Sequence, residues 1–199
     1  MRRLFFATTN AGKLRELARL VEGLPLEVVG RDAFGDLPEV EETGTTFAEN
    51  ARLKARAMAE ATGLWCLADD SGLAVDALNG APGVHSARYV EGSDRDRYEA
   101  LLQALKDVSD GARQARFHCA LCLAGPEGVL LEAEGRCEGR ILQGPEGEGG
   151  FGYDPIFGVG TDGPSMATLS PEQKQAISHR GAAFRELKSG LVELLGRTA

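Results

Sequence analysis

Two adjacent carboxylates, Asp69 and Asp70, are the residues in this sequence whose types and spacing most suggest chemistry. They follow a short apolar run over residues 65–68, which predicts a strand, and they precede Ser71 and a glycine. In an open α/β sheet, ligands bind just beyond the carboxyl ends of strands. Because side chains alternate along a strand, both carboxylates can face one ligand only if the strand ends before them. We therefore expect one working carboxylate and one supporting carboxylate, with a loop carrying two solvated acids as the alternative.

A third carboxylate, Glu42, comes from a separate segment just before a predicted helix over about residues 46–61. This helix begins with a Thr-x-x-Glu capping box. Asn50 and Lys54 are four residues apart on it and share one face, which either points into a site or is simply solvated. Two carboxylates brought together from separate segments can bind Mg²⁺ through oxygen ligands. Glu42 and Asp70 are therefore predicted to form a metal site.

A lysine, Lys13, follows the polar turn between the first predicted strand and the first predicted helix. A helix N-terminus carries a partial positive charge and free backbone N–H groups, so this turn is a candidate phosphate cradle. It is not a P-loop, because that motif would need glycine at Ala7 and serine or threonine at Leu14. An ordinary turn with an exposed lysine is the alternative.

The rest of the chain alternates predicted strands and helices. Strands are expected at residues 26–29, 115–123, 129–133 and 139–142, with a hairpin at 125–128, and capped helices are expected from about 93 and from 170, the latter breaking at 178–181 before a last amphipathic helix. A glycine-rich stretch over 143–152 leads into Phe151. This ring either stacks on a flat heterocycle or belongs to the core.

Composition excludes several classes of protein. The net charge of −8 argues against a general nucleic-acid binder, whose surface is basic. No apolar run reaches the roughly 18 residues of a membrane span and no signal-peptide pattern opens the sequence, so we expect a cytoplasmic protein. Cys119 and Cys122 have zinc-like spacing, but alternation within one strand places them on opposite faces. The four cysteines are therefore predicted to be buried free thiols.

Seven motifs in fixed order are more specific than any one of them. They are Thr8-Thr-Asn-Ala-Gly-Lys13, Glu41-Glu-Thr-Gly-Thr-Thr-Phe-Ala-Glu-Asn50, Ala68-Asp-Asp-Ser-Gly-Leu73, Gly80-Ala-Pro-Gly83, Ser86-Ala-Arg-Tyr89, Phe151-Gly-Tyr-Asp-Pro155 and Ser178-His-Arg-Gly181. Together they resemble the inosine triphosphate pyrophosphatase family, and the resemblance covers about residues 4–195.

The resemblance implies a single domain over residues 1–199, made of two lobes around a nucleotide-binding cleft. Its fold would be α/β, with an elongated mixed central sheet and helices on both faces. It further implies a homodimer that takes a purine nucleoside triphosphate. Together with the composition, we expect a cytoplasmic protein that binds neither nucleic acid nor membrane. With Mg²⁺, the enzyme would hydrolyse ITP, dITP and XTP to the monophosphate and pyrophosphate, which keeps these nucleotides out of DNA and RNA.

The resemblance also implies roles for individual residues. Asp70 would be the catalytic base and, with Glu42, would hold the metal. Substrate contacts would come from Thr8, Thr9, Asn10, Lys13, Lys54, Ser71, Phe151, Gly152, Tyr153, Asp154, Lys174, His179 and Arg180. A donor from Arg180 or His179 to the 6-oxo group would accept inosine and reject adenine. A nucleotide-sensing module without turnover and a pyrophosphatase for modified pyrimidine nucleotides are the alternatives.

Overall fold

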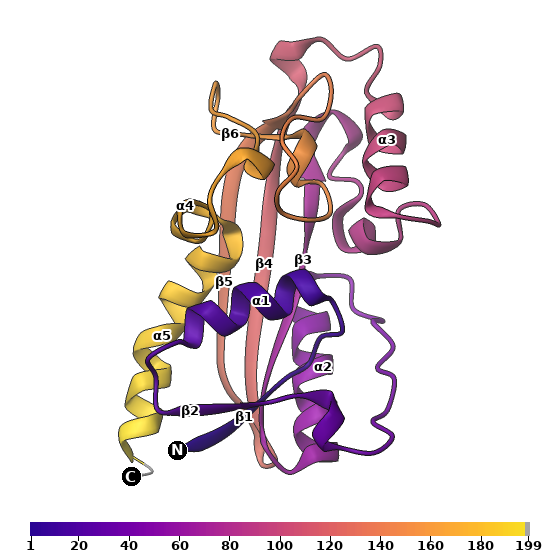
Figure 1. Cartoon of the computed structure of the whole chain (residues 1–199). Coiled ribbons are helices and arrows are strands. Elements are labelled where there is room, and N and C mark those ends of the chain that lie inside the picture. The colour runs from indigo at the N-terminus through magenta and orange to yellow at the C-terminus, as the bar shows by residue number, and fades with distance from the viewer. Residues whose placement is uncertain (198–199) are drawn as a thin grey trace. The chain divides into compact units, whose positions relative to one another are not determined.

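The computed structural model describes residues 1–197 as two compact units (Figure 1). Unit 1 comprises Met1–Asp70, Cys119–Gly135 and the chain from Arg180 onward, and unit 2 comprises Ser71–His118 and Arg136–His179. No helix within residues 1–197 has both the length and the apolar character to cross a bilayer.

Strands from both units form one mixed sheet, as predicted. Over residues 1–197 its six strands lie in the order β2-β1-β3-β4-β5-β6. They are β1 (Arg2–Phe6), β2 (Leu26–Val29), β3 (Trp65–Val75), β4 (Gln114–Gly125), β5 (Gly128–Ile141) and β6 (Phe157–Val159). β1 is parallel to β2 and to β3, whereas β5 is antiparallel to β6.

The first four helices begin after polar residues whose side chains accept hydrogen bonds from N–H groups of the first turn. They are α1 (Ala11–Val21), α2 (Phe47–Thr62) and α5 (His179–Arg197), together with α3 (Asp94–Ala104) and α4 (Pro171–Ile177) in unit 2. Complete capping boxes start α2 at Thr46, α3 at Ser93 and α4 at Ser170. Short 3₁₀ turns lie at Arg31–Ala33, Asp76–Leu78, Gly83–Arg88, Asp110–Ala112, Asp154–Ile156 and Met166–Thr168.

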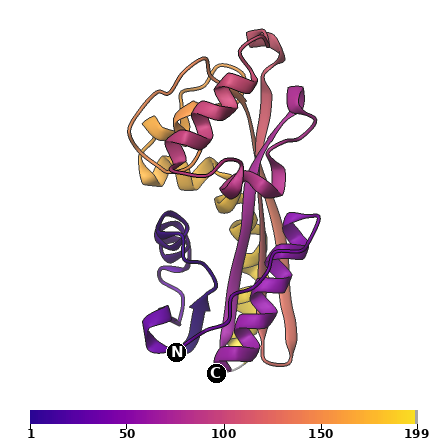
Figure 2. The ribbon, with the colours of Figure 1, turned by 90° about the vertical axis from the view of Figure 1, so that its right-hand side faces the viewer.

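Strand alternation gives unit 1 a separate apolar core on each face of its strands. Leu67, Cys119 and Leu121 pack with α1 and α5 on one face. Cys66 and Cys122 pack with α2 on the other face. α2 and α5 accordingly run along the strands on opposite sides (Figure 2). This arrangement confirms the helices on both faces and the separation of Cys119 from Cys122, and all four cysteines are buried free thiols.

Unit 2 has a core of its own beneath α3. Leu101 of α3 and Leu105, the C-cap residue of that helix, are fully buried against Leu73 and Val75 of β3. Phe117 of β4 and Phe157 of β6 complete this cluster, with ring centroids 4.5 Å apart. The core therefore fixes the strand ends from which the loops of unit 2 leave.

Two predicted strand boundaries were wrong. The strand expected at residues 65–68 continues through both carboxylates to Val75. The strands expected at 129–133 and 139–142 are one strand of fourteen residues, β5. In both cases polar residues lie within a hydrogen-bonded strand, because strand neighbours satisfy the backbone whatever the side chain is.

Candidate functional site

The two adjacent carboxylates lie inside β3, so alternation sends them to opposite faces of unit 1. Asp69 follows Leu67 toward α1 and α5, whereas Asp70 follows Cys66 and Ala68 toward α2. They therefore meet different helices and do not share one ligand-facing loop. The sequence predicted one working and one supporting carboxylate, and the structure shows that the two lie on opposite faces of the strand.

Asp69 is a buried carboxylate surrounded by cations and donors. Its side chain is fully buried and forms ion pairs with Lys13 of α1 and, at 2.9 Å from Oδ2, with Nε of Arg180 in α5. The thiol of Cys119 donates to Oδ2 at 3.0 Å, and Arg180 also pairs with Glu16. Burial alone would raise the pKa of Asp69, but the charges of Arg180 and Lys13 hold that pKa well below its usual value.

Asp70 lies in a group that joins two carboxylates through one ammonium. Lys54 Nζ donates to Glu42 Oε1 at 2.8 Å, to the Asp69 carbonyl at 2.8 Å and to Asp70 Oδ1 at 3.1 Å. Asn50 Nδ2 donates to Asp70 Oδ2 at 3.2 Å. Burial raises the pKa of the Asp70 carboxyl against the opposing charges of Lys54 and Lys13.

The turn before α1 has the geometry of a helix N-terminus with an asparagine cap. Asn10 Oδ1 accepts from the Lys13 N–H at 3.1 Å, and the Thr8 hydroxyl accepts from the Asn10 N–H at 3.2 Å. Thr9 and Asn10 are exposed. The predicted strand, turn and helix are confirmed, and the helix begins two residues before Lys13. The free N–H groups of this first turn and the Lys13 ammonium are the groups that bind anions at helix starts.

The loop from Phe151 to Asp154 in unit 2 is held by carboxylates. Asp154 is buried, and its Oδ2 accepts from the Phe151 N–H at 2.8 Å and from Lys174 Nζ at 2.5 Å. Asp94, in the first turn of α3, accepts from the Gly152 N–H at 2.7 Å. The Lys174 ammonium lies 4.6 Å from the centre of the Phe151 ring, which is half-buried. A planar ring and a cation thus lie together here, a combination that binds flat polar heterocycles.

The other predicted residues of unit 2 have less distinctive surroundings. Tyr153 is buried and donates its hydroxyl to the Ser86 carbonyl at 2.9 Å, so the Ser86 motif supports this loop. His179 is buried with its ring stacked on Phe117, the two centroids being 4.8 Å apart. Ser71 is half-buried in β3.

The structure thus groups the predicted site residues within each unit. Unit 1 contains Thr8, Thr9, Asn10, Lys13, Glu42, Lys54, Asp70 and Arg180, and unit 2 contains Ser71, Phe151, Gly152, Tyr153, Asp154, Lys174 and His179. Their functional roles stay predictions.

Three residues with contacts to these groups were not predicted to belong to the site: Asn50, Cys119 and Glu16. Asn50 shares with Lys54 a helix face that was predicted either to point into a site or to be solvated, and it ends one of the seven motifs, but it was given no role of its own. Cys119 was predicted only as a buried free thiol of its strand, and Glu16 of the first helix was given no role.

A divalent cation fits the group of Glu42 and Asp70. One ammonium already contacts both carboxylates, so this point attracts positive charge. Within residues 1–197, no three His, Cys, Asp or Glu side chains converge as a complete protein cage for a metal. That donor set suits Mg²⁺, which usually takes one or two carboxylates and completes its shell with water and phosphate oxygens.

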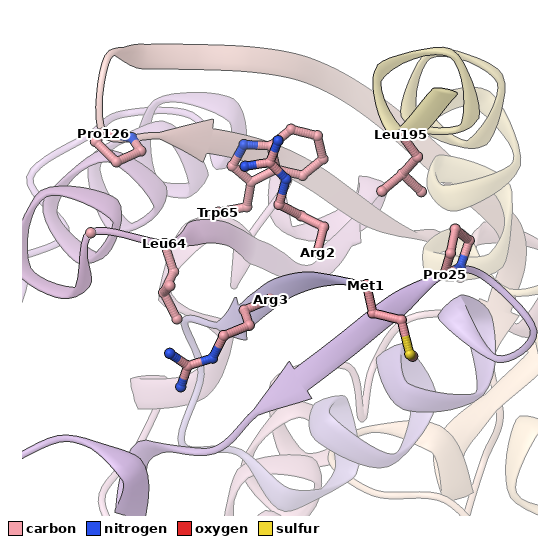
Figure 3. Close-up of a pocket in the computed structure, with 9 residues that line it drawn as sticks. Met1, Arg2, Arg3, Pro25, Leu64, Trp65, Pro126 and Leu195 are labelled. Carbon is pink, nitrogen blue, oxygen red and sulfur yellow. The ribbon is translucent and has the colours of Figure 1, made fainter. Parts of the chain in front are cut away.

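A cavity elsewhere in unit 1 contains none of the predicted site residues. It is lined by Met1, Arg2, Arg3, Pro25, Gly63, Leu64, Trp65, Pro126 and Leu195 (Figure 3). The Arg2 guanidinium stacks on the Trp65 ring at 4.5 Å from its centre. The cavity therefore lies beside the first residues of β1 and β3, away from the carboxylates of β3.

Comparison with known proteins agrees with the motifs. The model of the Ham1 family matches residues 4–190. The dITP/XTP pyrophosphatase of Streptomyces coelicolor is 51% identical over 98% of this chain and 100% of its own length. That of Prochlorococcus marinus strain MIT 9313 is 56% identical over 96% of this chain and 92% of its own. Among solved structures, a HAM1 protein from Coxiella burnetii is 43% identical with a TM-score of 0.86, covering 97% of this chain and 100% of that one.

Proposed function

We propose that this chain, which belongs to the Ham1 family, is a nucleoside triphosphate pyrophosphohydrolase for deaminated purine nucleotides. It would hydrolyse ITP, dITP and XTP to the monophosphate and pyrophosphate and so keep them out of DNA and RNA. Relatives that share about half of its residues over nearly its full length are dITP/XTP pyrophosphatases. The observation in the structure that carries the proposal is the pair Glu42 and Asp70, joined through Lys54.

The start of α1 is proposed to bind the triphosphate. Its N–H groups, the Thr8 and Thr9 hydroxyls, Asn10 and Lys13 supply donors and positive charge for the distal phosphates. The triphosphate would replace Asp69 as the ion-pair partner of Lys13, because both are anions that can bind the same ammonium. This accounts for a phosphate site in a protein whose net charge is −8.

Asp70 and Glu42 are proposed to hold Mg²⁺, and Asp70 to act as the base. When bound, the metal neutralises charge on the phosphate oxygens and polarises them. Asp70 accepts the proton of the attacking water, a role that a carboxylate beside the metal can fill. Lys54 orients the two carboxylates and faces the phosphates. Ser71, the next residue, is proposed to contact the phosphates.

The Phe151–Asp154 loop, Lys174, His179 and Arg180 are proposed to bind the base. Phe151 stacks on the purine, and cationic donors meet its 6-oxo group. Adenine presents an amino donor at this position, so a buried cation would be left unpaired, a mismatch that can reject a nucleotide by ~10⁴-fold. For Arg180 to act as this donor, it must exchange Glu16 for the base while it keeps its ion pair with Asp69.

The enzyme is further proposed to be a cytoplasmic homodimer that uses Mg²⁺ and binds neither nucleic acid nor membrane. The family resemblance supports the dimer, and the acidic net charge argues against a polyanionic partner. Light scattering of the purified protein would measure the dimer directly.

Pyrophosphate release from a panel of triphosphates tests the function. ITP, dITP and XTP should be good substrates and ATP a very poor one. Binding of ITP without turnover would identify a sensing module, and preference for a modified pyrimidine triphosphate would identify the other alternative. In the same assay, Arg180→Ala should lower kcat/KM for ITP and narrow the ITP/ATP ratio. An unchanged ratio would assign discrimination to the loop and Lys174.

A further inference from the structure

We propose that Asn50 is a positioning residue that fixes Asp70 and the segment carrying Glu42 in one arrangement, an inference that rests on the function proposed above for these carboxylates. Asn50 is fully buried in the first turns of α2. It is uncharged, it touches the predicted base, and the family motif alone gave it no role. Its two hydrogen bonds run to different segments of unit 1.

The side-chain amide of Asn50 bridges β3 and the loop before α2. Its Oδ1 accepts from the Gly44 N–H at 2.8 Å, and its Nδ2 donates to Asp70 Oδ2 at 3.2 Å. A backbone N–H can only donate and an ionised carboxylate can only accept, so these partners permit one orientation of the amide. Asn50 therefore bonds to both neighbours only in this orientation. An amide rotated by 180° would place its Nδ2 donor against the Gly44 N–H and its Oδ1 acceptor against the Asp70 carboxylate.

Gly44 shows how closely the loop approaches this amide. A Cβ atom on Gly44 would lie 2.6 Å from Asn50 Oδ1 and 2.6 Å from the Glu49 Cβ. Such contacts are too short for real carbon atoms, so only glycine brings the loop backbone into hydrogen-bond distance. The loop is held further along by Glu49, whose Oε2 accepts from the Thr45 N–H at 2.6 Å. Glu42, two residues before Gly44, is thereby held beside the start of α2.

The amide and the ammonium act on different oxygens of Asp70. Lys54 donates to Oδ1, and Asn50 donates to Oδ2. A second lysine in place of Asn50 would orient the carboxylate but would also repel a metal cation. The neutral amide fixes the carboxylate plane and leaves its negative charge available. Partners of this kind behind a metal ligand typically change metal affinity or activity by ~10–100-fold when removed.

Three variants of the full-length protein test this role. Asn50→Ala removes both hydrogen bonds, and Asn50→Asp keeps an acceptor for Gly44 but offers no donor to Asp70. Met58→Ala is the matched control, because Met58 is buried in the same helix and its side chain packs in the apolar cluster on that face of the strands. Chemical denaturation measures the stability of each variant, so that losses from folding are separated from losses of positioning.

Two readouts are measured: Mn²⁺ binding to the nucleotide-free protein by calorimetry, and steady-state hydrolysis of ITP at saturating Mg²⁺. We expect Asn50→Ala to weaken Mn²⁺ binding and to lower kcat by ~10–100-fold each, with KM for ITP changed less than about threefold. Asn50→Asp should lose kcat similarly. Met58→Ala should keep wild-type Mn²⁺ affinity and kcat.

Wild-type kcat in Asn50→Asp, or wild-type Mn²⁺ affinity in a folded Asn50→Ala, would overturn the inference. The same holds if Met58→Ala loses as much as Asn50→Ala at equal stability. Failure of the proposed function looks different, because the wild-type protein itself would then release no pyrophosphate from ITP.

Discussion

Replacing the two neighbouring carboxylates one at a time should separate stability from activity. Asp69→Asn and Asp70→Asn change adjacent residues of one strand by the same few atoms. The surroundings of the two side chains differ, however. The charges of Arg180 and Lys13 lower the pKa of Asp69, whereas burial raises the pKa of Asp70. We expect the first variant to lose mainly stability and the second mainly turnover.

The expected magnitude for Asp69→Asn follows from its ion pair with Arg180. The exposed fraction is 0% for the Asp69 side chain and 1% for the Arg180 side chain. Removing one partner of such a buried pair costs about 3–5 kcal/mol, because the other charge stays buried. In a chain of this length that loss lowers Tm by roughly 6–20 °C. Glu16, which also pairs with Arg180, favours the lower end of this range.

Asp70→Asn should change stability by less than about 1 kcal/mol, because burial already disfavours the ionised carboxyl in the folded protein. Turnover of ITP should fall by ~10²–10⁴-fold if Asp70 is the base. Lys54 keeps its bond to Glu42 in this variant. Urea denaturation and pyrophosphate release, measured on both variants, compare the two effects directly.

The stability lost in Asp69→Asn should depend on pH in one direction. The pKa of Asp69 is lowered by folding, so its stabilisation is fully present above the unfolded value of about 3.9 and is lost as pH falls below it. The difference in unfolding free energy between wild type and Asp69→Asn should therefore be constant near neutral pH and shrink below about pH 4. A stable Asp69→Asn, or an Asp70→Asn with wild-type turnover, would refute the division of roles.

Three further predictions concern the phosphate, metal and base groups. Lys13→Ala should weaken binding of ITP more than binding of IMP in calorimetry, because the lysine at the start of α1 is proposed to act on the distal phosphates, which IMP lacks; equal losses would contradict this role. Excess EDTA should abolish pyrophosphate release and added Mg²⁺ should restore it, whereas activity in EDTA would exclude a metal at Glu42 and Asp70. Lys174→Ala should raise KM for ITP by at least about tenfold with a smaller change in kcat, since its ammonium lies over Phe151 beside Asp154; an unchanged KM would remove Lys174 from the base site.

The family and, through it, the mixed sheet were predicted from the ordered motifs, whereas the helix starts were predicted from local signals. Capping boxes at Thr46, Ser93 and Ser170 identified helix starts because their chemistry lies within four residues. The alternation in β4 separated Cys119 from Cys122 because side-chain direction in a strand depends only on spacing. Such features require no knowledge of distant partners.

The course of β3 through the two carboxylates could not be predicted in this way. Consecutive acids resemble a loop in sequence, since nothing local shows that cations will meet them. The partners of Asp69 come from positions 13, 119 and 180, and each arrives on a different element. The local pattern predicted that the strand ends before Asp69, whereas contacts with residues distant in sequence allow it to continue through both carboxylates.

The charges of unit 1 explain how an acidic chain can present a site for a polyanion. Each of three cations forms an ion pair with a carboxylate: Lys13, Lys54 and Arg180. The net charge of −8 therefore does not reveal that these cations are concentrated in unit 1. These ion pairs are also what a triphosphate and a cation would exchange with. In the proposed function, a phosphate group would compete for Lys13 against Asp69, and a divalent cation would compete against the Lys54 ammonium for Glu42 and Asp70. Binding strength is then set by the difference between the two sets of partners rather than by total charge. Because Arg180 also holds Asp69, Lys13 can leave that carboxylate without stranding it as an unpaired buried charge.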